Sequence, residues 1–325
     1  CGGFSAVCGS SLATAATMSK VAMPPMRKYG YDEGLAAGSI AAGGTLGILI
    51  PPSVILIIFG IMTESDIGLL FIAGILPGLL GVILYLVAVL VTVTLKPEKG
   101  PRGDRFGWPQ RLQALWGVSG VLALFGLVIG GIYGGIFTPT EAAGIGASGA
   151  FFIALIRQRL SWQSLFETLV ESARTTAMIF VILIGAEIFS NYVNIAGLPE
   201  LLSGWVVSFD LSAIAVIMLI MLVYVVLGTV LESLSMIMLT VPVFYPLVLG
   251  LDLGGYSEAL MDPELALIWF GIIVVVITEI SLITPPVGLN VFVLKSMLDD
   301  VKLSTIFRGV TPFWIVDIVR LMTLI

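Results

Sequence analysis

The sequence predicts an all-α polytopic membrane protein with two inverted repeats, each made of a re-entrant helical hairpin and a broken transmembrane helix. Of the 325 residues, 58% are hydrophobic and 11% are charged, whereas soluble domains carry roughly 25% charged residues. Two double prolines, Pro51-Pro52 and Pro285-Pro286, interrupt apolar runs. Proline lacks a backbone N–H and disfavours helix at the preceding residue, so each helix must break there. At membrane depth such a break is tolerated only where it faces protein or a water-filled cavity.

The first repeat is expected at 1–95. Its opening segment has a tight turn at Gly9-Ser10, which we expect to be the tip of a hairpin. The apolar part of this segment is too short to cross the membrane, since a full crossing needs about 20 residues. We therefore expect a re-entrant hairpin whose first arm is truncated, in a chain that is a piece of a longer protein. The remaining elements of this repeat are a broken helix at 32–62, an interfacial helix at 64–74 and a span at 77–95.

The segment between the repeats is predicted to return to the cytoplasm. The loop at 96–111 has five Lys or Arg residues and two acidic residues, so the positive-inside rule makes it cytoplasmic. The region 112–173 follows, with a connecting helix pair at 112–134 and 139–157. Residues 161–173 place apolar side chains on one helix face, which predicts an amphipathic helix on the cytoplasmic surface.

The second repeat is expected at 174–325, in the opposite orientation. No Lys or Arg lies within 191–210, and four acidic residues follow between 252 and 264, so both segments are expected outside. Arg27 and Lys28 place the base of the first hairpin inside. The elements of this repeat are a span at 175–195, a hairpin at 211–250, a broken helix at 264–298, an interfacial helix at 301–308 and a truncated last span from near Pro312.

Polar residues cluster at the two hairpin tips and the two helix breaks. Carbonyl groups freed at a break suit a hard, weakly held cation such as Na⁺, while helix N-termini favour an anion. The candidate Na⁺ positions are Gly9, Ser10, Thr45, Gly47, Gly228, Glu232, Thr284 and Gly288. The candidate substrate positions are Ser11, Thr14, Ser53, Ser233 and Asn290. For each hydroxyl taken singly, a bond to its own helix backbone is an equal alternative.

Five acidic residues lie at apparent membrane depth, where a carboxylate needs a partner or a wet cavity. Glu232 and Glu279 flank the second candidate site, and we expect them to be functional. Glu141 is expected to cap a helix, Asp317 can pair with Arg320, and Glu187 has no assigned role. We expect no Lys or Arg near the centres of the candidate elements.

Several enzyme and metal classes are excluded by residue content. The chain has no histidine, which excludes histidine-based catalysis and histidine metal sites. Its two cysteines cannot build a disulfide framework or a four-thiolate site. No Walker A sequence is present, so this chain does not hydrolyse ATP by itself.

Four motifs in order, CGSSLATAAT, GTLGILIPPS, GGIYGGIFTPTEAAG and ITEISLITPPVGLNVFVL, resemble the large permease subunit of tripartite ATP-independent periplasmic (TRAP) transporters, the DctM-like family. The resemblance implies an elevator-type, Na⁺-driven importer of small carboxylates in the bacterial inner membrane. It implies two partners, a small DctQ-like membrane subunit and a periplasmic DctP-like solute-binding protein, with no cofactor beyond Na⁺ as coupling ion and no nucleic acid. The family's Na⁺ regions correspond to Ser10 with Thr45 and Gly47, and to Gly228 with Thr284 and Gly288.

Two other readings stay open at this point. One is a divalent anion/Na⁺ symporter with the same hairpin architecture and no binding protein. The other is an intramembrane enzyme that uses Glu232 and Glu279 as an acid–base pair, although no nucleophile or metal set accompanies them.

Overall fold

The computed structural model describes residues 1–101, 103, 107–209, 211–255 and 257–325. Arg102 and Arg105, on which the loop prediction partly depends, lie outside the described residues. The helices are α1 (Gly2–Cys8), α2 (Ser11–Val21), α3 (Met23–Lys28), α4 (Glu33–Thr45), η1 (Leu46–Ile48), α5 (Val54–Thr63), α6 (Ile67–Leu95), η2 (Pro97–Lys99), α7 (Trp108–Tyr133), α8 (Pro139–Ile156), α9 (Trp162–Ile195), α10 (Leu198–Ser208), α11 (Ala213–Gly228), α12 (Ser233–Leu249), η3 (Glu258–Met261), α13 (Pro263–Ser281), α14 (Leu289–Met297) and α15 (Leu303–Leu324). No strand occurs in the described residues, which confirms the all-α prediction.

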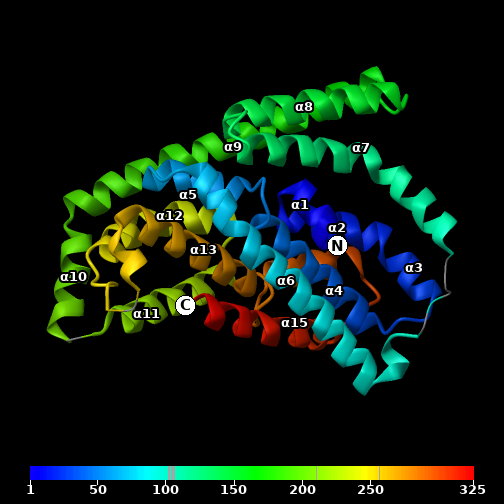
Figure 1. The fold of residues 1–325 in the computed structure, drawn as a ribbon. Helices are drawn as coiled ribbons and strands as arrows, with labels where there is room; N and C mark the ends of the chain where they lie inside the picture. Colours follow the sequence, from blue (N-terminus) through cyan, green and yellow to red (C-terminus); the bar gives the residue numbers. More distant parts are fainter. Residues whose placement is uncertain (102, 104–106, 210, 256) are drawn as a thin grey trace. The chain divides into compact units, whose positions relative to one another are not determined.

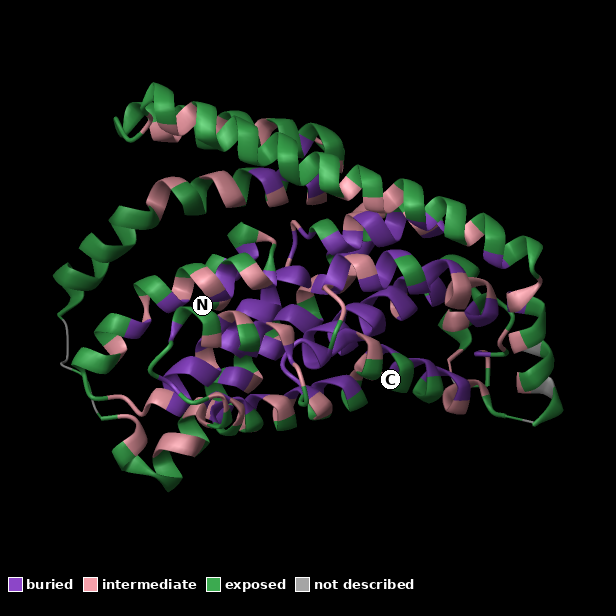
Figure 2. Ribbon diagram, turned by 180° about the vertical axis from the view of Figure 1, so that it is seen from behind, coloured by how far each residue is buried: buried purple, intermediate pink, exposed green. Residues whose placement is uncertain are grey.

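Five described helices are long and apolar enough to cross a membrane: α6, α7, α8, α9 and α13. The protein is therefore a multi-pass membrane protein. Its chain forms two compact units, one of Cys1–Arg102 with Ile188–Ile325 and the other of Gly103–Glu187. In the second unit, α7 packs against α8, and most of their side chains are exposed (Figure 2). Apolar side chains exposed along such long helices suit lipid as their surroundings.

The core of the first unit is formed by α4 and α13, whose residues are almost all buried (Figure 2). Glycine and alanine make up much of α4, so neighbouring helices approach its backbone closely. On one side α4 packs against α15, and α6 packs against both α13 and α15 (Figure 1). Each long helix thus covers a broken helix from the other half of the sequence.

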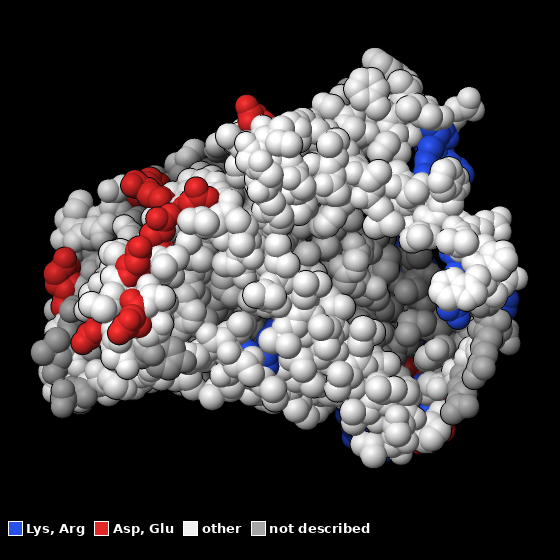
Figure 3. Space-filling view, in the orientation of Figure 1, with Lys and Arg blue, Asp and Glu red and all other residues white. Residues whose placement is uncertain are grey.

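The two broken helices run in opposite directions. Asp32, the N-cap of α4, accepts a bond from Lys99 Nζ at 3.3 Å, and Arg27 forms ion pairs with Glu33 at 3.0 Å and with Asp300 at 2.6 Å. Because Asp300 follows α14, the start of α4 and the end of α14 lie at the same end of the unit. Acidic side chains gather over the other end, near α12 and the start of α13 (Figure 3).

Three predicted divisions are wrong because the helices continue through them. The interfacial helix expected at 64–74 and the span at 77–95 together form α6, with Pro77 inside it. The interfacial helix at 301–308 likewise joins the last span in α15, which contains Pro312. A single proline removes one helical hydrogen bond, and these helices tolerate that loss. The amphipathic segment at 161–173 continues into the next span as α9, since no proline or glycine lies between them.

One helix was not predicted at all. The segment 191–210 was expected to be an external connection, but α10 forms within it, directly after Gly197. Gly197 has a φ of +70°, which ends α9 in the left-handed conformation that glycine adopts without strain.

Candidate functional site

The first helix break is a buried, non-helical turn between η1 and α5. Its peptide bond between Pro51 and Pro52 is cis. Ser53 closes the turn, because its Oγ donates to the carbonyl of Ile48 and accepts from the Leu56 N–H at 3.2 Å. The break thus lies inside protein, and carbonyls of η1 end beside it.

The first hairpin contacts this break through α1 rather than through its tip. Ser10 caps α2, accepting from Ala13 N at 3.4 Å, and is exposed. Ser5 Oγ instead donates to the Gly44 carbonyl at 2.6 Å. A Cβ on Gly47 would collide with the Ser5 backbone, so glycine is required for this close approach. Sequence reasoning missed Ser5, whose only signal is its place among small residues before the tip.

The second helix break follows α13 and is also built on a double proline, but its Pro285 and Pro286 are exposed. The bond between Pro285 and Pro286 is also cis, and Gly288 caps α14 at a φ of +62°. Thr284 Oγ1 donates to the Ile280 carbonyl at 2.6 Å and accepts from Trp314 Nε1 at 2.9 Å. A cavity of about 240 Å³ adjoins this break. Its lining is Ile283, Pro285, Phe307, Val310, Thr311 and Trp314.

The second hairpin tip is ordered by a carboxylate. Glu232 caps α12 by accepting from Leu234 N at 2.9 Å and Ser235 N at 3.3 Å, and Ser233 Oγ donates to its other oxygen at 2.8 Å. Gly228, at the end of α11, packs on Ser281 so closely that a Cβ would collide with it. This tip therefore contacts the end of α13, next to the second break.

Three buried oxygens lie between the two halves without hydrogen-bond partners among the described residues. They are Ser11 Oγ, Thr14 Oγ1 and Asn290 Oδ1. Asn290 Nδ2 donates across to the Ala41 carbonyl of α4 at 3.2 Å. A Cβ on Gly44 would lie 3.2 Å from the Ser11 carbonyl oxygen and 3.6 Å from Asn290 Nδ2, so α2 and α14 meet around this glycine. Leaving a buried polar atom unpaired costs about 1–3 kcal/mol, which makes these three atoms candidate ligands.

The other candidate residues are placed apart from this group. Ser53 lies in the first break and Ser233 in the second tip. The Thr45 hydroxyl donates to the Ala42 carbonyl of its own helix at 2.8 Å, and the Thr284 hydroxyl donates to the Ile280 carbonyl of α13. Both hydroxyl protons therefore bond to nearby helix backbone, which is the alternative given above. Their oxygens keep a lone pair for a further partner.

A charged cluster lies fully buried within the first unit. Glu279 and Asp317 both contact Arg320 Nη2, Asp317 at 3.0 Å, which confirms the expected pair with Asp317. The Tyr85 hydroxyl donates to Asp317. The expectation that no arginine lies near the candidate elements is wrong, because α15 folds back and brings Arg320 to α13. Glu279 and Glu232 have separate partners and do not form a pair.

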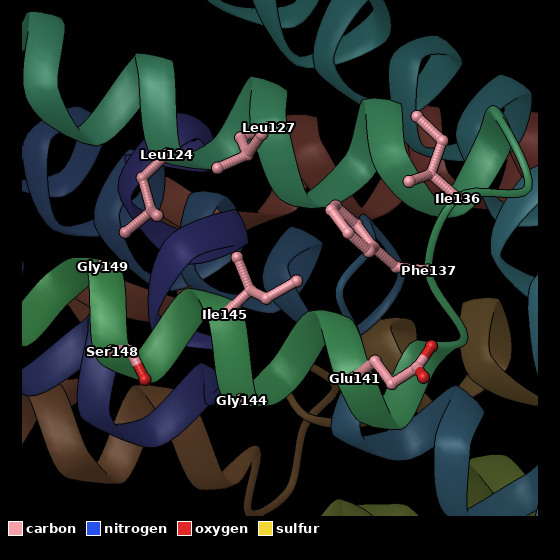
Figure 4. A pocket seen from close by; sticks show the side chains of 9 residues that line it. All are labelled: Leu124, Leu127, Ile136, Phe137, Glu141, Gly144, Ile145, Ser148 and Gly149. Carbon is pink, nitrogen blue, oxygen red and sulfur yellow. The ribbon is translucent and has the colours of Figure 1, made fainter.

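The second unit holds a groove of about 760 Å³ between α7 and α8 (Figure 4). It is lined by Leu124, Leu127, Ile136, Phe137, Glu141, Gly144, Ile145, Ser148 and Gly149. Glu141 is a helix cap, as expected: it accepts from the Thr138 N–H at 2.9 Å, and its own N–H donates to Thr138 Oγ1 at 3.3 Å. None of the candidate ion or substrate residues faces this groove.

Comparison with known proteins decides the family. The whole chain, residues 1–325, matches the family described as "Tripartite ATP-independent periplasmic transporter, DctM component". The chain belongs to the DctM family. It is 36% identical over 322 residues to the C4-dicarboxylate TRAP transporter large permease protein DctM of Pseudomonas aeruginosa, covering 98% of this chain and 71% of that protein. This family membership makes the protein a transporter subunit, not an enzyme.

Other relatives carry different transport names. The sialic acid TRAP transporter large permease protein SiaM of Vibrio cholerae is 32% identical over 314 residues, covering 95% of this chain and 69% of that protein. The 2,3-diketo-L-gulonate TRAP transporter large permease protein YiaN of Escherichia coli is 32% identical over 317 residues, covering 95% of this chain and 69% of that protein. These relatives are named for chemically different solutes.

Proposed function

We propose that this DctM-family chain is the membrane-transport subunit of a Na⁺-coupled importer of small organic acids. It acts in the bacterial inner membrane with a small membrane subunit and a periplasmic solute-binding protein. The two broken helices and their hairpins move together across the membrane as an elevator, carrying ion and substrate between the two sides.

The observation that carries this proposal is a pair of antiparallel helix breaks, each contacted by a hairpin. The first break is largely buried, and in the second Thr284 and Gly288 are buried while Pro285 and Pro286 are exposed. A break leaves carbonyl oxygens at the end of one half-helix and N–H groups at the start of the next. The ends of η1 and α13 present the negative ends of helix dipoles, which suit Na⁺, while the starts of α5 and α14 favour an anion. Because the two broken helices run in opposite directions, one break can present this arrangement of helix ends toward each side of the membrane.

The solute class is proposed from the printed names of the relatives and from the chemistry of the central group. C4-dicarboxylates, sialic acid and 2,3-diketo-L-gulonate are all organic acids. Around Gly44 the available side chains are the hydroxyls of Ser11 and Thr14 and the amide of Asn290, which are neutral. Among the described residues Arg320 is the only buried Lys or Arg, and its Nη2 already forms ion pairs with two carboxylates. A carboxylate substrate is therefore held by neutral donors, helix N-termini and bound Na⁺.

The test is uptake into proteoliposomes that contain the complete assembly, with the Na⁺ gradient varied. Thr284→Val keeps the side-chain volume and removes the hydroxyl at the second break, so the apparent Na⁺ affinity should fall. Thr92→Val is the matched control, because Thr92 also donates to a backbone carbonyl one helical turn earlier, that of Ala88 at 2.7 Å, and lies away from both breaks. Ser10→Val tests the first tip in the same assay.

Uptake that needs no Na⁺ gradient would remove the coupling proposal. If both Thr284→Val and Ser10→Val keep the parent Na⁺ dependence, these hydroxyls do not belong to the ion sites. Uptake measured without the binding protein distinguishes this proposal from the remaining alternative, because a divalent anion/Na⁺ symporter of this architecture would transport without a binding protein.

A further inference from the structure

The buried charged cluster of Glu279, Asp317, Arg320 and Tyr85 takes no part in the Na⁺ and substrate groups described above. Its members come from three helices, α13, α15 and α6. Glu279, Asp317 and Arg320 are 0% exposed, and Tyr85 is 6% exposed. Tyr85 packs edge-on against the Phe313 ring, with 5.3 Å between the two ring centroids.

The formal charges of this cluster do not balance. Two carboxylates face one guanidinium, so the fully ionised cluster has a net charge of −1 in a site without solvent contact. An uncompensated buried charge is strongly unfavourable, and a buried group neutralises instead. The cluster therefore needs one further positive charge.

No protein side chain supplies that charge among the described residues. The elements of the cluster and those packed against them include α4, α5, α6, α11, α12, α13, α15 and η1. Their other charged residues are Glu33, Glu264 and Arg308, in the first turns of α4 and α13 and near the start of α15, and none of them is buried. At the cluster itself, the Arg320 guanidinium lies against Gly81, where a Cβ would also come within 2.8 Å of Leu46 in η1.

Asp317 and Glu279 differ in how many groups stabilise their ionised forms. Asp317 accepts a hydrogen bond from the Tyr85 hydroxyl at Oδ2, while its Oδ1 lies 3.0 Å from Arg320 Nη2 in an ion pair and receives no hydrogen bond among the described residues. Glu279 receives only Arg320 Nη2 on one oxygen, and its Oε1 has no partner among the described residues. A hydrogen-bond donor and a nearby cation both stabilise the ionised form of a carboxyl. Asp317 has Tyr85 as donor in addition to its ion pair with Arg320, whereas Glu279 has Arg320 alone, so Asp317 stays ionised and Glu279 is the group that takes up a proton.

We propose that this cluster is a proton-binding site, with one proton carried by the Glu279 carboxyl and Asp317 paired with Arg320. A proton balances the charge without adding a cation beside the guanidinium, whereas Na⁺ there would be repelled by it. The site is separate from the proposed Na⁺ positions and does not depend on them. Because Glu279 lies two residues before the end of α13 and Arg320 lies beside η1, loss of the proton places a net charge next to both helix breaks.

The proposal is tested on the purified full chain by infrared difference spectroscopy, which distinguishes a protonated carboxyl from a carboxylate. The parent protein should show a buried protonated-carboxyl band at neutral pH, and Glu279→Gln should lose it. Glu264→Gln, on the same helix but in its exposed first turn, should keep it. No such band in the parent, or a band unchanged in Glu279→Gln, would overturn the proposal. A band lost only in Asp317→Asn would overturn the assignment to Glu279.

Two further measurements keep the test independent of how the variants fold. Dicyclohexylcarbodiimide adds to protonated carboxyls in apolar surroundings, so mass spectrometry of the treated parent protein should find the adduct on Glu279 and not on Glu264; an unmodified Glu279 contradicts the proposal. Replacing choline by Na⁺ at constant pH should leave the infrared band in place. Disappearance of the band in Na⁺ would instead make this a Na⁺ site and end the proton assignment.

Discussion

Replacing Gly309 with alanine should destabilise the first unit, because α15 and α4 touch there through their backbones. A Cβ on Gly309 would fall on the Gly34 carbonyl group and lie 3.0 Å from Gly34 Cα. Carbon atoms in ordinary contact are about 3.5–4.0 Å apart. The Gly34 carbonyl carbon lies even closer than Gly34 Cα, so α15 would have to move away by more than about 1 Å. Backbone cannot rotate aside as a long side chain can.

The expected cost follows from two opposing effects. Overpacking of a well-packed core costs about 1–3 kcal/mol, while alanine gains back about 1 kcal/mol over glycine within a helix. We expect a net loss of up to about 2 kcal/mol in the free energy of unfolding. Gly126→Ala in α7 is the matched control, because a Cβ there meets nothing within 4 Å, and only the favourable helix effect should remain.

The assay is thermal unfolding of the purified protein in detergent, with both variants measured beside the parent. Gly38→Ala is a second test of the same contact, because a Cβ on Gly38 of α4 would lie 2.8 Å from the backbone nitrogen of Val310 in α15. If α15 has already moved to admit one methyl group, the second should cost less, so the double variant should lose less than the sum of the single losses. A Gly309→Ala protein as stable as Gly126→Ala would refute the close backbone contact.

Three other predictions concern the break, the topology and the cytoplasmic end. Alanine at both Pro285 and Pro286 should preserve insertion but abolish uptake in proteoliposomes; near-normal uptake would mean that the break only ends a helix. In a chain whose native cysteines are replaced by serine, Gly103→Cys should react with a membrane-impermeant maleimide only from the cytoplasm and Ser257→Cys only from outside, and labelling from one side would contradict the inverted repeats. The hydrogen bond from Arg27 holds the pKa of Asp300 below its ordinary value of 3.8, so the pair stabilises the fold above that pH and is lost only as the pH falls through the lowered pKa. Asp300→Asn should leave the pH dependence of thermal stability unchanged between about pH 5 and 8, and a difference in that range would show that another group is involved.

Local signals in the sequence were enough to locate the helix breaks and hairpin tips. The double prolines and the glycine of each tip act on the backbone of their own neighbourhood, whatever packs around them. The same logic failed at 64–74 and 301–308, because a change in polarity along an apolar segment does not interrupt a helix. Gly74 and Gly309 serve close packing inside continuous helices.

Contacts between distant residues could not be predicted in this way. Arg320 and Glu279 are 41 positions apart, and Trp314 and Thr284 are 30 apart, so only the folded arrangement of α13 and α15 shows that they meet. The sequence did identify Asn290, Ser11 and Thr14 as candidates by type and position. It could not show that these three keep unpaired buried oxygens while Thr45 and Ser53 bond to nearby carbonyls.

The bond between Asn290 and Ala41 joins residues 249 positions apart, which has a consequence for biosynthesis. Much of the surface of α4 is covered by α14 and α15, and the ribosome makes these helices long after α4. Until then, the glycine-rich α4 and the open backbone after it lack their final neighbours in the bilayer, where unpaired polar groups are costly. Contacts of such long sequence separation also close slowly. The first half must therefore wait in an incomplete state through most of translation, and a ribosome stalled before α14 should leave a nascent chain that membrane quality-control proteases degrade.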